Sequence, residues 1–94
     1  MKKKSSQFKF RRSPDLPFRV VDEEVVIVSP PKGEVTVLNE TAAKIWQLLD
    51  GKRTLKQIAD ILTDEFEVKR EKAYSDCLDF IKKLEQKGFI QSEY

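Results

Sequence analysis

Ninety-four residues allow one domain with a modest core, so a catalytic cleft between two domains is not expected. The chain has no histidine, the commonest general base and metal ligand, and its single cysteine forms neither an internal disulfide nor a zinc site. No apolar run approaches the roughly 20 residues of a membrane span, and the N-terminus lacks the apolar segment of a signal peptide. These features predict a soluble, cytoplasmic protein without a metal site, and no cofactor is expected.

The positive charge of the chain is concentrated at its N-terminus. The sequence holds 18 Lys and Arg against 16 Asp and Glu, yet six of the basic residues and no acidic one lie within residues 1–12. The rest has 12 basic and 16 acidic residues, a net charge of −4. We therefore expect residues 1–15 to be a basic, disordered tail and residues 16–94 to be the folded domain. Such a tail either contacts nucleic acid or an acidic partner, or only keeps the chain in solution.

Three short segments rich in β-branched residues precede the first helical pattern. Residues 18–21 are a strand candidate, and residues 25–28 are apolar on both faces, as in a central strand. After a turn with Pro and Gly, residues 34–38 form a third candidate in which Val35 and Val37 share one face. The N-terminal half is thus predicted to be a three-stranded antiparallel sheet. In sequence order, its third strand lies at an edge with unpaired backbone groups.

Three helices are predicted after the sheet. Asn39 can cap the first, whose end we assign to Gly51, and Thr54 can cap the second. The third spans residues 70–87 and ends at Gly88. A small antiparallel sheet followed by three helices is an α+β arrangement that resembles a winged helix-turn-helix domain.

The third helix has a wider apolar sector than a simple core contact requires. At 100° per residue the sector spans about 160°, against ~100° for a typical surface helix. In angular order, its members are Phe80, Ala73, Leu84, Cys77, Ile81, Tyr74 and Leu78. One margin must face something besides the first two helices. That is either the small sheet or a groove, between this helix and the edge strand, that is open to an extended peptide.

The scaffold is compatible with two functions of different class. In a DNA-binding transcriptional regulator the third helix would enter the major groove, whereas in a peptide-binding module the sheet would accept an extra strand. Acidic residues on the polar side of the helix balance its lysines, on a net-acidic domain, which favours the second function. Lys69 and Arg70 remain either as phosphate contacts or as a solvated helix start. We keep DNA binding as the alternative and do not expect a nucleic-acid partner.

Two stretches together carry a more specific pattern. Residues 38–54 read LNETAAKIWQLLDGKRT, and residues 76–90 read DCLDFIKKLEQKGFI. This ordered combination resembles the PqqD family over roughly residues 18–90. Family members are recognition elements for ribosomally synthesised and post-translationally modified peptides (RiPPs), and the resemblance implies a stand-alone peptide chaperone of this kind. The Pro30-Pro31 pair and the Lys-rich N-terminus depart from the family pattern.

The resemblance implies a function without catalysis. The chain would bind the leader segment of a precursor peptide and present it to a modifying enzyme, such as a radical S-adenosylmethionine (SAM) enzyme, in RiPP or quinone-cofactor biosynthesis. The leader would add an antiparallel strand to the third strand and lie against the third helix. No membrane partner is expected, and the chain is expected to be a monomer or a weak dimer.

Carrying the family site onto this sequence gives a set of peptide-binding residues. Main-chain hydrogen bonds would come from Val35, Thr36, Val37 and Leu38. Apolar contacts would come from Tyr74, Cys77, Phe80, Ile81 and Leu84, and polar contacts from Asp76 and Lys83. The apolar side chains of Leu38, Ile45, Trp46 and Leu49 are expected to serve the core.

Overall fold

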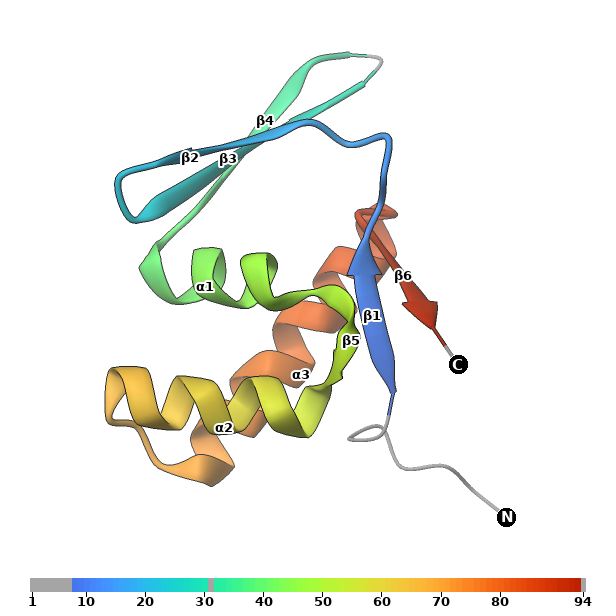
Figure 1. Ribbon diagram of the computed structural model, residues 1–94. Helices are drawn as coiled ribbons and strands as arrows, with labels where there is room; N and C mark the ends of the chain where they lie inside the picture. The colour runs from blue at the N-terminus through green and yellow to red at the C-terminus, as the bar shows by residue number, and fades with distance from the viewer. Residues whose placement is uncertain (1–7, 31, 94) are drawn as a thin grey trace.

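The computed structural model describes residues 8–30 and 32–93 of the chain. Within these residues lie two three-stranded sheets and three helices (Figure 1). One sheet sits over the first helix, while the other lies beside the helices, where the two ends of the described chain meet. The α+β class, with an antiparallel sheet ahead of three helices, is confirmed.

The first sheet positions the edge strand on which the predicted site depends. Its strands, in spatial order, are β2 (Phe18–Val21), β3 (Glu24–Ser29) and β4 (Glu34–Leu38). Both pairings are antiparallel, and β3 lies between the other two strands. Because side chains alternate along a strand, β3 buries Val25 and Ile27 completely against α1 and turns Val26 and Val28 to the other face. The edge position predicted for β4 is confirmed.

The helices begin where the sequence predicts. They are α1 (Glu40–Leu48), α2 (Leu55–Phe66) and α3 (Arg70–Lys87). The Asn39 side chain accepts a hydrogen bond from the Ala42 N–H at 3.0 Å. Thr54 and Gln57 form a reciprocal capping box at the start of α2, with bonds of 3.2 and 2.8 Å. α3 ends at Gly88, whose φ of 75° is left-handed.

The end of α1 differs from the prediction. The helix stops at Leu48, and the Leu49 N–H closes its last turn on the Trp46 carbonyl at 3.2 Å. Gly51 does have a left-handed φ of 81°, but it lies inside a strand, β5 (Asp50–Thr54). The assignment of Gly51 as the residue that ends the helix is therefore wrong, because the chain has already turned at Leu49.

A second sheet involves a part of the chain that we expected to be disordered. Its strands are β5, β1 (Lys9–Arg12) and β6 (Ile90–Glu93), with β1 in the centre and antiparallel to both neighbours. β1 buries Phe10 in the core, where only 6% of the residue is exposed. The expectation of disorder up to residue 15 is thus wrong for Lys9–Arg12, while residues 1–7 of that tail lie outside the described residues.

One apolar core connects the helices to both sheets. Trp46 is completely buried and meets the Phe18 ring edge-on, with ring centroids 5.5 Å apart. The core positions predicted at Leu38, Ile45, Trp46 and Leu49 are buried as expected. α3 packs along α2, and an ion pair of 3.1 Å between Arg70 and Asp60 links the two helices. Each helix in the described part of the chain is too short or too polar to span a bilayer.

Candidate functional site

The direction of the backbone hydrogen bonds shows which groups of the first sheet are occupied. The Val28 N–H donates to the Pro17 carbonyl at 3.2 Å, on the β2 side of β3. Because backbone polar groups point to alternate sides along a strand, those of Ile27 point toward β4. Ile27 is paired in register with Thr36, so the Thr36 backbone faces β3 and is used within the sheet.

The same alternation leaves two residues of β4 with backbone groups that point away from the sheet. Val35 and Val37 flank Thr36, so their N–H and C=O groups lie on the side of β4 that has no neighbouring strand in the described structure. Leu38, like Thr36, directs its backbone groups toward β3, where it pairs with Val25. Of the four residues expected to supply main-chain hydrogen bonds, only Val35 and Val37 therefore offer free groups.

The side chains of β4 divide between the two faces of the sheet. Val35 and Val37 are 63% and 57% exposed on the outer face. Thr36 is half-buried on the inner face, and Leu38 is buried in the core. An extended segment placed along β4 would thus meet two exposed valine side chains on one face and the half-buried Thr36 on the other.

Three of the predicted contacts on α3 belong to the core. Cys77, Ile81 and Leu84 are at most 2% exposed and pack with the other buried residues. Burial raises the pKa of the Cys77 thiol to about 12, with a smaller effect from the nearby Asp76 carboxylate. These three side chains offer no surface to a ligand, so their assignment as peptide contacts is corrected.

Two predicted apolar contacts lie on opposite margins of α3. Tyr74 is half-buried and lines a cavity of about 290 Å³ between α2 and the start of α3. Phe80 is also half-buried, but six residues along a helix place it about 120° away from Tyr74. Asp76 and Lys83 are exposed and share the Phe80 side of the helix. The structure therefore groups Phe80, Asp76 and Lys83, and places Tyr74 against α2 instead.

α3 and β4 are packed on different neighbours. The extensive contacts of β4 are with β3 and α1, and those of α3 are with α2 and β6. In Figure 1, α3 crosses behind α1 and α2, while β4 lies above α1. The structure thus shows no extensive contact between β4 and α3.

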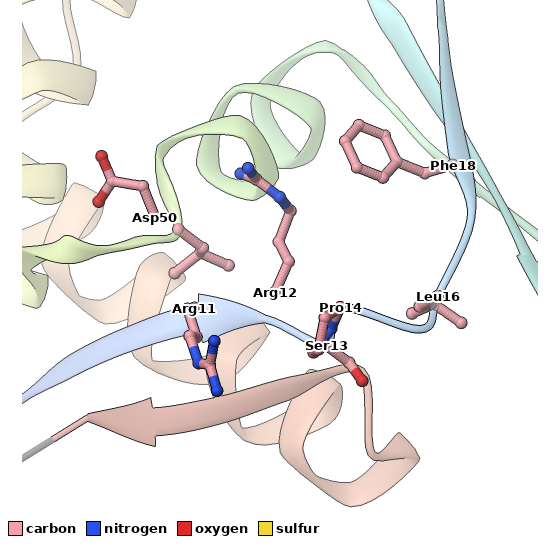
Figure 2. Close-up of a pocket in the computed structure, with 8 residues that line it drawn as sticks. Arg11, Arg12, Ser13, Pro14, Leu16, Phe18 and Asp50 are labelled. Carbon is pink, nitrogen blue, oxygen red and sulfur yellow. The ribbon is translucent and has the colours of Figure 1, made fainter.

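A separate pocket of about 300 Å³ lies where the segment between β1 and β2 passes the end of α1 (Figure 2). One Arg12 nitrogen (Nη1) donates to the carbonyl oxygens of Trp46 and Gln47, at 2.9 and 3.0 Å. The Arg12 guanidinium also lies 5.4 Å from the centre of the Phe18 ring. Arg12 therefore joins three parts of the fold, a role for which the basic N-terminal composition gave no signal.

The carboxylate of Asp50 borders the same pocket and is fixed by local bonds. It accepts the Lys52 N–H at 2.9 Å and the Arg53 N–H at 3.2 Å, and it pairs with the Arg53 side chain at 2.6 Å. The Lys52 hydrogen bond, aided by Arg53, holds the pKa of Asp50 below its usual value. An acid held ionised in this way stabilises the start of β5 and is poorly suited to donate a proton. Among the described residues, no three His, Cys, Asp or Glu side chains are placed to hold a metal ion.

Comparison with known proteins gives a family match and several similar structures. The model of the family described as coenzyme PQQ synthesis protein D (PqqD) matches residues 24–90. A search of curated protein sequences finds no match. The matched range includes β3, β4 and all three helices described above.

Two similar structures are complexes with leader peptides. Lasso peptide synthetase B1 complexed with the leader peptide is 31% identical, with a TM-score of 0.78 over 88% of this chain and 98% of that one. TbiB1 in complex with the TbiA(beta) leader peptide is 26% identical, with a TM-score of 0.78 over 86% of this chain and 94% of that one.

A third structure shares the fold at lower identity. It is the PqqD truncation of PqqCD from Methylobacterium extorquens, described as a functional, stand-alone RiPP recognition element. It is 24% identical, with a TM-score of 0.71 over 87% of each chain.

Proposed function

This chain belongs to the PqqD family, and on that basis we propose that it binds the leader segment of a ribosomally synthesised precursor peptide as an added strand on β4. The observation that carries the proposal is the pair of outward-facing backbones at Val35 and Val37, on a strand that has no neighbour on that side within residues 8–30 and 32–93. Two similar proteins are known in complex with leader peptides, which supports the same class of ligand here. The role is binding, without catalysis.

The geometry of β4 defines how such a peptide would bind. Two peptide residues opposite Val35 and Val37 would exchange N–H···O=C bonds with them, as in any antiparallel pair. These bonds accept almost any sequence, so selectivity must come from side chains. For side-chain contacts we propose the Phe80 side of α3, where the half-buried Phe80 would supply apolar contact and the exposed Asp76 and Lys83 would supply charge. Thr36 and Leu38 shape this face without supplying backbone bonds.

The bound leader would be presented to a modifying enzyme. Holding the leader keeps the core segment of the same peptide near the enzyme, which raises its effective concentration by orders of magnitude. The enzyme we propose is a peptide-modifying one, such as a radical SAM enzyme in RiPP or quinone-cofactor biosynthesis. Because the precursor is made on the ribosome, this role belongs in the cytoplasm.

The charges on α3 disfavour the alternative, DNA binding. Its exposed acidic residues are Glu71, Asp76, Asp79 and Glu85, and its exposed lysines are Lys72, Lys82, Lys83 and Lys87. Lys72 is also engaged with Asp76 at 3.4 Å. A helix surface of balanced charge gains little from the phosphate backbone, which dominates the affinity of DNA-binding proteins.

The proposal is tested by first identifying a short precursor-peptide gene beside the gene for this protein, and then titrating the chain into the fluorescently labelled leader of that peptide. We expect saturable binding that changes little with salt, and weaker binding by Phe80→Ala with the fold retained in circular dichroism. Lys56→Ala, on the exposed surface of α2, is the matched control and should bind as the unchanged chain does. Absence of saturable peptide binding, together with salt-sensitive binding to duplex DNA, would reverse the assignment.

A further inference from the structure

The solvent-exposed outer face of the first sheet carries apolar side chains. Val28, Val35 and Val37 are 40%, 63% and 57% exposed, and the half-buried Val26 lies among them. The register places Val26 opposite Val37 and Val28 opposite Val35, so the four side chains form one patch. We call it the valine patch. Antiparallel sheets with one face in water usually carry polar side chains on that face, so the valine patch is a candidate interaction surface.

The valine patch ends at a strand edge whose one protecting charge within β4 is Glu34, at the start of the strand. Within β4, from Glu34 to Leu38, there is no proline, no lysine and no break in the register with β3. Exposed edges of this kind pair with other strands unless charges, prolines or bulges prevent it. The free edge of β4 and the valine patch together are suited to pairing with a second strand whose outer face is also apolar.

We propose that β4 pairs with β4 of a second copy of this chain, antiparallel, about a two-fold axis that passes through Thr36. In this register Val35 of one copy lies opposite Val37 of the other, and the reverse holds by symmetry. Both residues direct their backbone outward, so the two Val35–Val37 pairs exchange four hydrogen bonds. The two valine patches then merge into one apolar stripe across a six-stranded sheet.

The pairing runs only along β4, from Glu34 to Leu38, because Lys32 lies in the turn before the strand and Glu40 begins α1. At each end of the paired segment, Glu34 of one copy lies opposite Leu38 of the other. If the register shifted by one residue, the outward-facing backbone of Val35 or Val37 would lie opposite a residue whose N–H and C=O groups are already bonded to β3. A two-fold axis at Thr36 avoids this mismatch.

The size of the contact indicates a weak, reversible dimer. The valine patch offers on the order of 300 Å² per copy, well below the ~800 Å² per partner of a standard stable interface. Self-pairing would therefore dissociate on dilution. If the proposed function holds, leader and second copy would compete for the Val35 and Val37 backbones, so leader binding would convert dimer to monomer.

The direct test uses a cysteine at the two-fold axis. In the proposed pairing, Thr36 of each copy forms a non-hydrogen-bonded pair with Cα atoms about 4.5 Å apart, within the range that a disulfide spans. Thr36→Cys should form a disulfide-linked dimer under mild oxidation. Val28→Cys is the control, because it is exposed on the same sheet but lies three strands from its counterpart. The buried Cys77 gives no background.

Sedimentation velocity of the unmodified chain, without any peptide, gives the second arm. We expect a sedimentation coefficient that rises with concentration between 10 µM and 1 mM, roughly the range of a weak transient interface. Val35→Lys and Val37→Lys should each raise the dissociation constant at least about threefold, because a charge at either position disrupts the merged apolar stripe. A monomer at all concentrations, or equal cross-linking of Thr36→Cys and Val28→Cys, would overturn the dimer and leave the peptide proposal untouched.

Discussion

Arg12 shows how one side chain can connect distant parts of a small fold. Its guanidinium donates hydrogen bonds to two carbonyl oxygens in the last turn of α1, and it also lies over the ring of Phe18. A cation at the C-terminus of a helix also interacts favourably with the helix dipole. The side chain is half-buried, so water competes only partly for these contacts.

Replacing Arg12 should therefore lower the stability of the protein. Arg12→Ala removes two hydrogen bonds from a charged donor, and we expect a loss of about 1.5–3 kcal/mol in the free energy of unfolding. Arg19→Ala, at an exposed arginine on β2, should change it by no more than about 0.5 kcal/mol. Urea unfolding followed by circular dichroism measures both, and equal losses would contradict the role of Arg12.

The Cys77 thiol should be inert in the folded protein. Burial raises its pKa from 9.0 to about 12, so the folded state holds far less thiolate at pH 8 than the unfolded state. We expect reaction with a disulfide reagent such as Ellman's reagent to be at least about 100-fold slower in the native chain than in guanidinium. Similar rates in both states would show that Cys77 is accessible, as the peptide-contact assignment required.

The same pKa shift fixes the direction of one pH effect. The folded pKa lies above the unfolded value, so the contribution of Cys77 to stability is complete below pH 9. It declines as the pH rises from about 9 toward 12, where the unfolded thiol ionises and the folded one does not. In a Cys77→Ala variant, this contribution to the fall in the free energy of unfolding between about pH 9 and 12 should be absent.

At the scale of the element, β4 alternates between residues that hold the sheet and residues that face outward. Thr36 directs its backbone to β3, whereas Val35 and Val37 direct theirs to the free edge. This alternation makes two neighbouring positions respond in opposite ways to the same substitution, since proline removes only the N–H group of its own residue.

Val37→Pro should weaken peptide binding and leave the fold intact. Proline is tolerated in an edge strand where the missing N–H faced solvent, so we expect a small stability change and at least a tenfold loss of leader affinity. Thr36→Pro removes an N–H that bonds to β3 and should clearly destabilise the protein. Thermal unfolding and peptide anisotropy separate the two variants, and equal destabilisation would mean that the backbone directions are assigned wrongly.

The first sheet and the helices could be predicted from sequence because their signals are local. Asn39, Thr54 and Gly88 are capping residues next to periodic apolar runs, and residues 34–38 alternate with period two. The second sheet could not, because Lys9 pairs with Thr54 and Glu93, far along the chain. With six basic residues among its first twelve, the N-terminus resembles a disordered tail, and Phe10 alone gave little indication of a strand.

The site was predicted in part for the same reason. Period and edge position identified β4, but the angular sector of α3 did not show which margin α2 covers. The three central residues of that sector, Cys77, Ile81 and Leu84, serve the core. Only the packing of neighbouring helices separates Tyr74 on one margin from Phe80 on the other.

At the scale of the molecule, the second sheet ties the beginning of the described chain to its end. β1 lies between β5 and β6, and its Phe10 side chain enters the core that also receives Phe89 and Ile90. The scaffold that presents β4 therefore depends on a segment that lies before the range of the family match, which begins at residue 24.

Phe10→Ala should accordingly be among the more damaging changes in the chain. Loss of a buried phenylalanine typically costs about 3–5 kcal/mol, which is a large part of the stability of a small domain. Phe10→Leu, which keeps most of the volume, should cost less than about 1.5 kcal/mol. The exposed Lys9→Ala serves as the control in chemical unfolding. If residues 9–12 contributed nothing to stability, none of the three variants would lower the free energy of unfolding.

Amide hydrogen exchange, measured residue by residue by NMR with and without the leader peptide, tests the central claim most directly. At a concentration where the chain is monomeric, the Val35 and Val37 amides should exchange fast, while those of Thr36 and Leu38 are protected by β3. Saturation with the leader should slow exchange at Val35 and Val37 and leave Thr36 and Leu38 unchanged. Saturable peptide binding without added protection at Val35 and Val37 would show that the leader does not bind as a strand on β4.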